Sequence, residues 1–117
     1  METLKALHTR NSVVSLSEPA PTQEEMELVF QAALRAPDHA WLRPWRFIEV
    51  TGEGRKKLGN AFLKTAKDQN EDLSEVLIEK AKKSPYRAPM VLVLIADIKE
   101  HPKVPEIEQI ISTGAAA

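Results

Sequence analysis

An uninterrupted apolar run, MVLVLIA at residues 90–96, restricts the folds open to this chain more than any other feature. A strand without polar alternation is typical of the centre of a sheet, where both of its faces are covered. We therefore expect helices above and below this strand. The run is far too short to cross a bilayer as a helix, which needs about 20 apolar residues.

Helix signals fill much of the first third of the chain. Leu4 and Leu7 fall on one side of a short helix predicted over residues 2–9. A second helix is predicted to begin at Thr22, which forms a capping box with Glu25, and to end before Pro37. Its apolar positions have the spacing of one packed face: Met26, Val29, Phe30, Ala33 and Leu34.

The remaining elements alternate between strand and helix. Residues 45–52, WRFIEVTG, alternate apolar and polar side chains and predict a half-buried strand. Two helices are predicted within residues 55–83, separated near DQNED, and another helix opens near Pro105. No repeat or low-complexity linker interrupts this order. A chain of 117 residues buries about two-thirds of its unfolded surface, which predicts one domain with one core.

Composition excludes several classes of function. The formal net charge is −1, so we expect neither a nucleic-acid nor a membrane partner. The absence of cysteine excludes disulfides, thiol catalysis and cysteine-ligated metals, and the three separated histidines predict no metal site. The sequence also lacks HExxH, GxGxxG and the phosphate-binding loop GxxxxGK[ST]. The N-terminus does not have the pattern of a signal peptide, and we expect a cytoplasmic protein.

The stretch HTRNS at residues 8–12 is the first candidate for ligand chemistry. A guanidinium group offers a phosphate two parallel donors, and a hydroxyl group adds another hydrogen bond. From spacing alone, however, the plainer interpretation is favoured, with Arg10 solvated and Ser12 in a turn.

The second candidate is RAPDHAWLRPWRF at residues 35–47, which is richer in chemistry than a helix-to-strand connection needs. Taken singly, His39 is more often a loop residue bonded to backbone than a ligand contact. Trp41 and Trp45 are of the type that seals a core edge or an interface.

Taken together, these stretches resemble the nitroreductase family of flavoenzymes, particularly its small bacterial members. The most specific part is a helix ending in RAP, followed by DH and then by PW at the start of a strand; HTRNS and SPYRAPMVLVLIAD lie in matching order. The resemblance implies a three-layer α+β fold, with a central, mostly antiparallel sheet flanked by helices. Residues 1–117 would then form the N-terminal portion of a single nitroreductase-like domain, whose long core helix and later strands are expected beyond Ala117.

The resemblance also implies an intertwined homodimer with two FMN molecules at the subunit interface. Arg10, Asn11 and Ser12 would bind the phosphate and ribityl region of the flavin, while Arg35 and His39 would approach it from the partner subunit. NADH or NADPH would give a hydride to flavin N5 and leave, and a nitroaromatic or quinone oxidant would then take the electrons in a ping-pong sequence. No catalytic side chain is expected, because the flavin carries the redox chemistry.

The chain departs from the family pattern at several positions. Asn11 stands where the usual motif has a second arginine, and Val14 where many members have a basic residue. Arg43 replaces a common glutamine and is a candidate substitute for the missing charge at position 14. Trp41 would either narrow the pocket or pack at the interface. Two alternatives stay open beside the enzyme: a non-enzymatic flavin-binding protein, and a cofactor-free dimeric scaffold.

Overall fold

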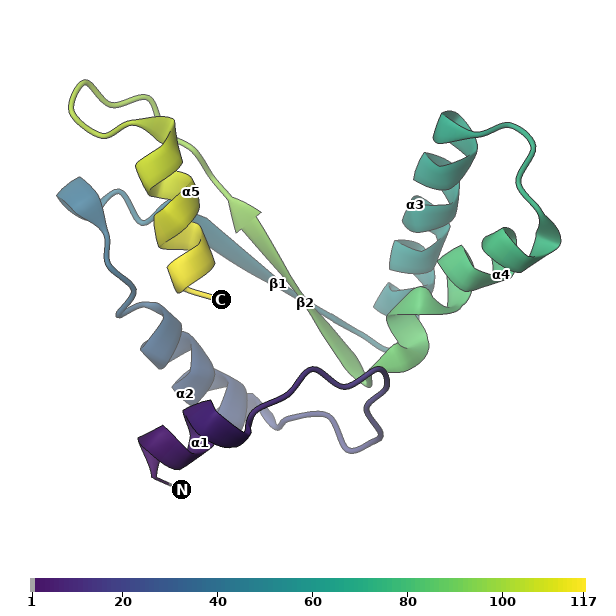
Figure 1. Cartoon of the computed structure of the whole chain (residues 1–117), viewed down its shortest axis with the longest axis horizontal. Coiled ribbons are helices and arrows are strands. Elements are labelled where there is room, and N and C mark those ends of the chain that lie inside the picture. The colour runs from purple at the N-terminus through teal and green to yellow at the C-terminus, as the bar shows by residue number, and fades with distance from the viewer. Residues whose placement is uncertain (1) are drawn as a thin grey trace.

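The computed structural model describes residues 2–117, which form two strands, five α-helices and two short 3-10 helices. Figure 1 shows helices α1 and α2 together with α5 around one part of the strand pair, and a separate hairpin of α3 and α4 beyond its far end. In chain order the elements are α1 (Thr3–Thr9), α2 (Gln23–Ala33), η1 (His39–Trp41), β1 (Trp45–Thr51), α3 (Glu53–Gln69), α4 (Glu75–Lys83), η2 (Ser84–Arg87), β2 (Met90–Ala96) and α5 (Glu106–Ala115).

The two strands form an antiparallel ribbon of seven residue pairs. Its register runs from Trp45 opposite Ala96 to Thr51 opposite Met90. At about 3.4 Å per residue, the ribbon is roughly 20 Å long. One end adjoins η1, where β1 begins, and the other adjoins η2, where β2 begins. This combination of helices with an antiparallel sheet confirms the predicted α+β class.

Helix α2 begins as its capping box predicts. Thr22 Oγ1 accepts a hydrogen bond from the Glu25 N–H at 3.2 Å, and Glu25 Oε2 accepts one from the Thr22 N–H at 2.8 Å. These two bonds satisfy backbone donors that have no partner within the helix. The helix ends at Ala33, before Pro37.

The apolar face predicted for α2 is only partly buried. Met26 is buried, and the Phe30 ring packs on the Phe47 ring of β1 with 5.3 Å between centroids. Val29 and Leu34, by contrast, keep about half of their surface exposed. The helix therefore rests on the ribbon along one narrow line, because Met26 and Phe30 lie one turn apart.

The α3–α4 hairpin matches the predicted break near DQNED. Helix α3 ends at Gln69, and α4 begins after Ser74, whose side chain accepts a hydrogen bond from the Leu77 N–H. The two helices pack closely at Gly59. A Cβ atom added to Gly59 would lie 2.4 Å from the carbonyl oxygen of Lys82, so only glycine permits this approach.

The cover predicted for the apolar run is incomplete within residues 2–117. Leu92 and Ile95 of β2 are each nearly two-fifths exposed, and within residues 2–117 the strand is paired with one other strand, β1, and contacted chiefly by one of the helices, α5. The chain has 9361 Å² of accessible surface, whereas a compact protein of 13.1 kDa has about 6,400 Å². The radius of gyration is 17.3 Å against about 13 Å for a compact domain of this length. Apolar surface is thus left available to other polypeptide.

Candidate functional site

The first group of predicted site residues follows α1 directly. Arg10 is the C-cap of that helix, and Arg10, Asn11 and Ser12 are all exposed. Across residues 2–117 their side chains make no hydrogen bond with the rest of the chain. A guanidinium, an amide and a hydroxyl group on three successive residues are therefore available as donors. This donor set suits a phosphate group.

A contact distant in sequence holds the segment that follows these donors. Arg87 Nε donates a hydrogen bond to the Val14 carbonyl oxygen at 2.7 Å, and the Leu16 N–H donates one to the Arg87 carbonyl oxygen, also at 2.7 Å. Consecutive Cα atoms are 3.8 Å apart, so Ser12 lies within about 8 Å of Val14. We call this pair of bonds the Arg87 clamp. Sequence reasoning missed it, because no periodic pattern links residues more than 70 positions apart.

Arg55, near the start of α3, contacts the two residues that flank Arg87 in the sequence. Its Nη1 atom donates to the Ala88 carbonyl oxygen at 2.9 Å, and its guanidinium carbon lies 5.0 Å from the centre of the Tyr86 ring. These contacts fix the chain on both sides of Arg87. The clamp is therefore attached to the ribbon end rather than to a free loop.

The second group of predicted residues lies in the connection between α2 and β1. Arg35 is exposed just beyond α2, and His39 opens η1. His39 Nδ1 lies 2.8 Å from Glu108 Oε2 of α5, so its partner is a side chain rather than the backbone acceptor expected from its type. Beside η1 is a cavity of about 300 Å³, which we call the η1 cavity. Its lining residues are Leu34, Arg35, Ala36, Asp38, Trp41, Arg43 and Trp45.

One chain does not bring the two groups together. The Arg87 clamp holds Val14, two residues beyond the first group, at the end of the ribbon where β2 begins, whereas Arg35 and His39 precede the end where β1 begins. The ribbon between them spans roughly 20 Å. Arg43 and Val14 are separated in the same way. Arg43 is therefore distant from Val14 in the same chain, and its role as a substitute for the charge at position 14 stays a prediction.

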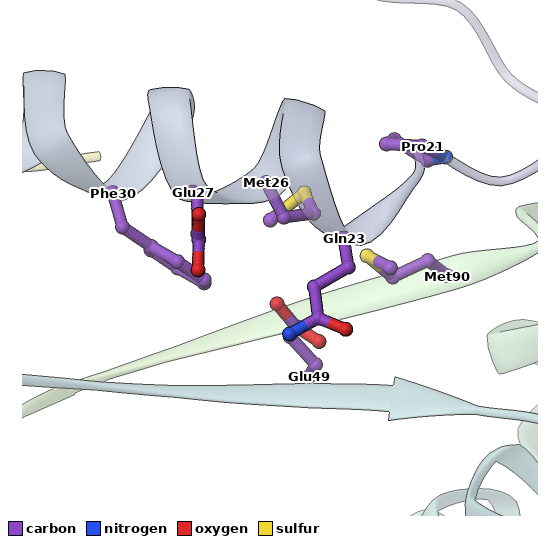
Figure 2. Close-up of a pocket in the computed structure, with 7 residues that line it drawn as sticks. All are labelled: Pro21, Gln23, Met26, Glu27, Phe30, Glu49 and Met90. Carbon is purple, nitrogen blue, oxygen red and sulfur yellow. The ribbon is translucent and has the colours of Figure 1, made fainter.

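A further cavity, of about 290 Å³, lies between α2 and the ribbon. Figure 2 shows Gln23, Glu27 and Phe30 extending from α2 toward the strands, with Glu49 pointing back from β1. The charged groups in its lining are the carboxylates of Glu27 and Glu49. Two carboxylates oppose the binding of a phosphate or another anion. The cationic η1 cavity and the Arg10–Ser12 donors remain better candidates.

Other classes of site have no support in the part of the chain that the structure describes. Residues 2–117 contain no group of three or more histidine or acidic side chains placed to hold a metal ion. Over the same residues, none of the helices has both the length and the apolar character that crossing a membrane requires. The cytoplasmic location expected from the sequence stays a prediction.

The chain belongs to the nitroreductase family, whose profile matches residues 7–117. It is 38% identical over 116 residues to the protein named "Putative NAD(P)H nitroreductase YdjA" of Escherichia coli (strain K12). It is 43% identical over 117 residues to one named "Putative NAD(P)H nitroreductase" of Haemophilus influenzae. Both alignments cover 99% of this chain and 62% of the relative, so the chain spans less than two-thirds of these proteins' length.

A solved structure supports the same fold. The nitroreductase-like family protein from Bacillus cereus superposes with a TM-score of 0.67 at 24% sequence identity. The superposition covers 99% of this chain and 58% of the other. The family and the fold expected from the RAP, DH and PW pattern are thus confirmed.

Proposed function

We propose that this chain is part of an FMN-dependent oxidoreductase that uses NADH or NADPH as its electron donor. Membership of the nitroreductase family and the names of two relatives support this class of reaction. The observation that carries the proposal is the exposed donor set at Arg10, Asn11 and Ser12, whose segment is held by the Arg87 clamp.

Two chains are needed to complete the proposed site. The segment that follows Arg10, Asn11 and Ser12 is held at one end of the ribbon, and Arg35 and His39 lie near the other, so the second group would reach the flavin from the partner in a homodimer. The large exposed apolar surface of residues 2–117 favours such an assembly.

The protein's part in the mechanism is to bind and orient. The Arg10 guanidinium and the Ser12 hydroxyl donate hydrogen bonds to the phosphate, and Asn11 adds an amide donor without charge. Arg35 adds positive charge from the partner, and the contact with Glu108 fixes the His39 ring. Bound FMN would supply hydride-transfer chemistry between NAD(P)H and a nitroaromatic or quinone acceptor, in ping-pong order. No side chain need act as a nucleophile or obligatory acid.

The Arg10→Ala substitution tests the phosphate assignment. Loss of a charge-assisted bond costs about 1.5–3 kcal/mol, so the dissociation constant for FMN should rise at least tenfold. Riboflavin, which lacks the phosphate, should bind the variant and the natural protein equally. Both constants can be measured from the quenching of flavin fluorescence in the full-length protein. Unchanged affinity for FMN would reject the role of Arg10.

NADH oxidation by the FMN-loaded protein separates the enzyme from the two alternatives. A flavin-binding protein without activity would retain yellow FMN after desalting but would not oxidise NADH or NADPH. A cofactor-free scaffold would stay colourless and dimeric. Oxidation of NAD(P)H coupled to reduction of a nitroaromatic or quinone is the result that we expect.

A further inference from the structure

The backbone around η1 adopts a conformation that its residues rarely take. Ala40, Trp41 and Arg43 have φ angles of 59°, 57° and 46°. None of them is glycine, and a positive φ is unusual for a residue with a bulky side chain. Backbone strain of this kind gathers at ligand-binding sites, where the surrounding structure enforces it.

Hydrogen bonds from several directions enforce this conformation. Asp38 Oδ2 accepts from the Arg43 N–H at 3.0 Å, and Lys99 Nζ donates to the Leu42 carbonyl oxygen at 2.6 Å. The carbonyl oxygen of the buried Pro44 accepts from Thr113 Oγ1 at 2.7 Å and from the Asp97 N–H at 2.9 Å. The β2–α5 connection and α5 itself therefore hold the loop in its strained form.

The loop held in this conformation leaves the side chain of Trp41 exposed. Trp41 is 80% exposed, whereas Trp45, four residues later, is only 7% exposed. Trp45 thus seals a core edge, one of the two roles expected from its type, whereas Trp41 covers no core edge within residues 2–117. The Arg43 guanidinium carbon lies 5.6 Å from the centre of the Trp41 ring, in the range of a cation–π contact. The loop presents an aromatic face and a cation side by side.

The adjoining cavities match these two groups. The η1 cavity is lined by two cationic residues, Arg35 and Arg43, and by one acidic residue, Asp38, whose carboxylate already accepts a hydrogen bond from the Arg43 N–H. A neighbouring, more open cavity of about 550 Å³ shares Leu34, Arg43 and Trp45 with it and adds two aromatic residues, Phe30 and Phe47, and a further cation, Arg46. Arg43 therefore stands where a cationic cavity meets an aromatic one. The volume of the η1 cavity, about 300 Å³, accommodates a ligand with a single ring.

We propose that Trp41 and Arg43 form a subsite for planar aromatic anions of one ring, such as aromatic carboxylates. The ring of the ligand stacks on Trp41, and its anionic group accepts hydrogen bonds from the Arg43 fork. The inference rests on the proposed function in one respect: it gives that enzyme a preference for acidic aromatic acceptors. Trp41 and Arg43 depart from the family pattern, so the preference would belong to this chain.

Binding of two matched probes to the full-length, FMN-loaded protein tests the subsite in the absence of NAD(P)H. The probes are 4-nitrobenzoate, which is anionic, and 4-nitrobenzamide, which is neutral and similar in shape. We expect titration calorimetry to give tighter binding of the anion. Arg43→Gln should weaken the anion about tenfold and leave the amide unchanged, since a charge-assisted bond is lost. Trp41→Ala should weaken both probes, and Trp41→Phe should restore most of the affinity.

Lys64→Gln, which removes an exposed cation from α3, is the charge control and should change neither constant. Equal affinity of the natural protein for the two probes would overturn the subsite, as would an anion affinity unaffected by Arg43→Gln. If Trp41→Ala left both affinities unchanged but altered the mass of the assembly, Trp41 would be a subunit contact, and the proposal would again fail.

The same titrations on flavin-free protein distinguish this proposal from the proposed function. Failure to retain FMN or to oxidise NAD(P)H would count against the oxidoreductase, while preferential binding of 4-nitrobenzoate would still support the subsite. Retained FMN and NAD(P)H oxidation without anion preference would sustain the enzyme and reject the subsite.

Discussion

At the scale of single residues, two helical glycines differ in what surrounds them. A Cβ atom at Gly59 would meet the Lys82 backbone at 2.4 Å, whereas one at Gly114 would meet nothing within 4 Å. Gly59→Ala should therefore destabilise the protein by about 1–3 kcal/mol, as overpacking does. Gly114→Ala, in α5, should instead stabilise it by up to about 1 kcal/mol through helix propensity. Urea unfolding of the two variants measures both effects, and equal shifts would contradict the close packing of α3 on α4.

The sequence predicts single residues well where the signal is local. The capping box at Thr22 and Glu25 is confirmed because both partners lie within one turn. Gln109 is the opposite case: it is 2% exposed and bonded to the backbone of Lys99, although no local sequence pattern indicates that this glutamine is buried. The positive φ angles near η1 could not be predicted either, because none of the residues that adopt them is glycine.

At the scale of elements, the Arg87 clamp connects the N-terminal segment to the sheet. Arg87→Met removes the donor to the Val14 carbonyl oxygen and keeps the apolar stem. Loss of one hydrogen bond, worth about 1 kcal/mol, should loosen residues 10–16 and weaken FMN binding about fivefold. Faster hydrogen exchange at the Leu16 N–H should accompany this loss.

Lys64→Met is the control for Arg87→Met. Lys64 is also an exposed cation, but it lies on α3, away from both groups of predicted site residues. This variant should bind FMN normally. If both variants lost affinity equally, the effect would be one of general charge rather than of the clamp.

Helices and strands with regularly spaced apolar residues were predictable from the sequence. The elements against which they pack were not. The strands at residues 45–51 and 90–96 and the break between α3 and α4 follow from alternation, apolar runs and helix breakers. The antiparallel register of β1 on β2 and the contact of His39 with α5 depend on residues 39 or more positions apart. Such pairings leave no local pattern. The candidate residues were therefore predictable by type, but their distribution over the two ribbon ends was not.

At the scale of the whole molecule, the expanded shape limits what one chain can do alone. The accessible surface exceeds that of a compact protein of equal mass by roughly 3,000 Å². Leu4, Leu7 and Trp41 are among the large apolar side chains left exposed. Surface of this extent is available to other polypeptide, either further elements of the same domain or a second chain.

The placement of the two residue groups at opposite ends of one ribbon has a genetic consequence. If each flavin takes its donors from two chains, a chain carrying Arg10→Ala and a chain carrying Arg35→Ala damage different halves of each site. Either homodimer would then hold two weakened sites. A mixed dimer, however, would concentrate both lesions in one site and leave the other intact. Co-expressing the two defective chains with different purification tags should recover one tightly bound FMN per heterodimer, whereas a site built from a single chain would show no such complementation.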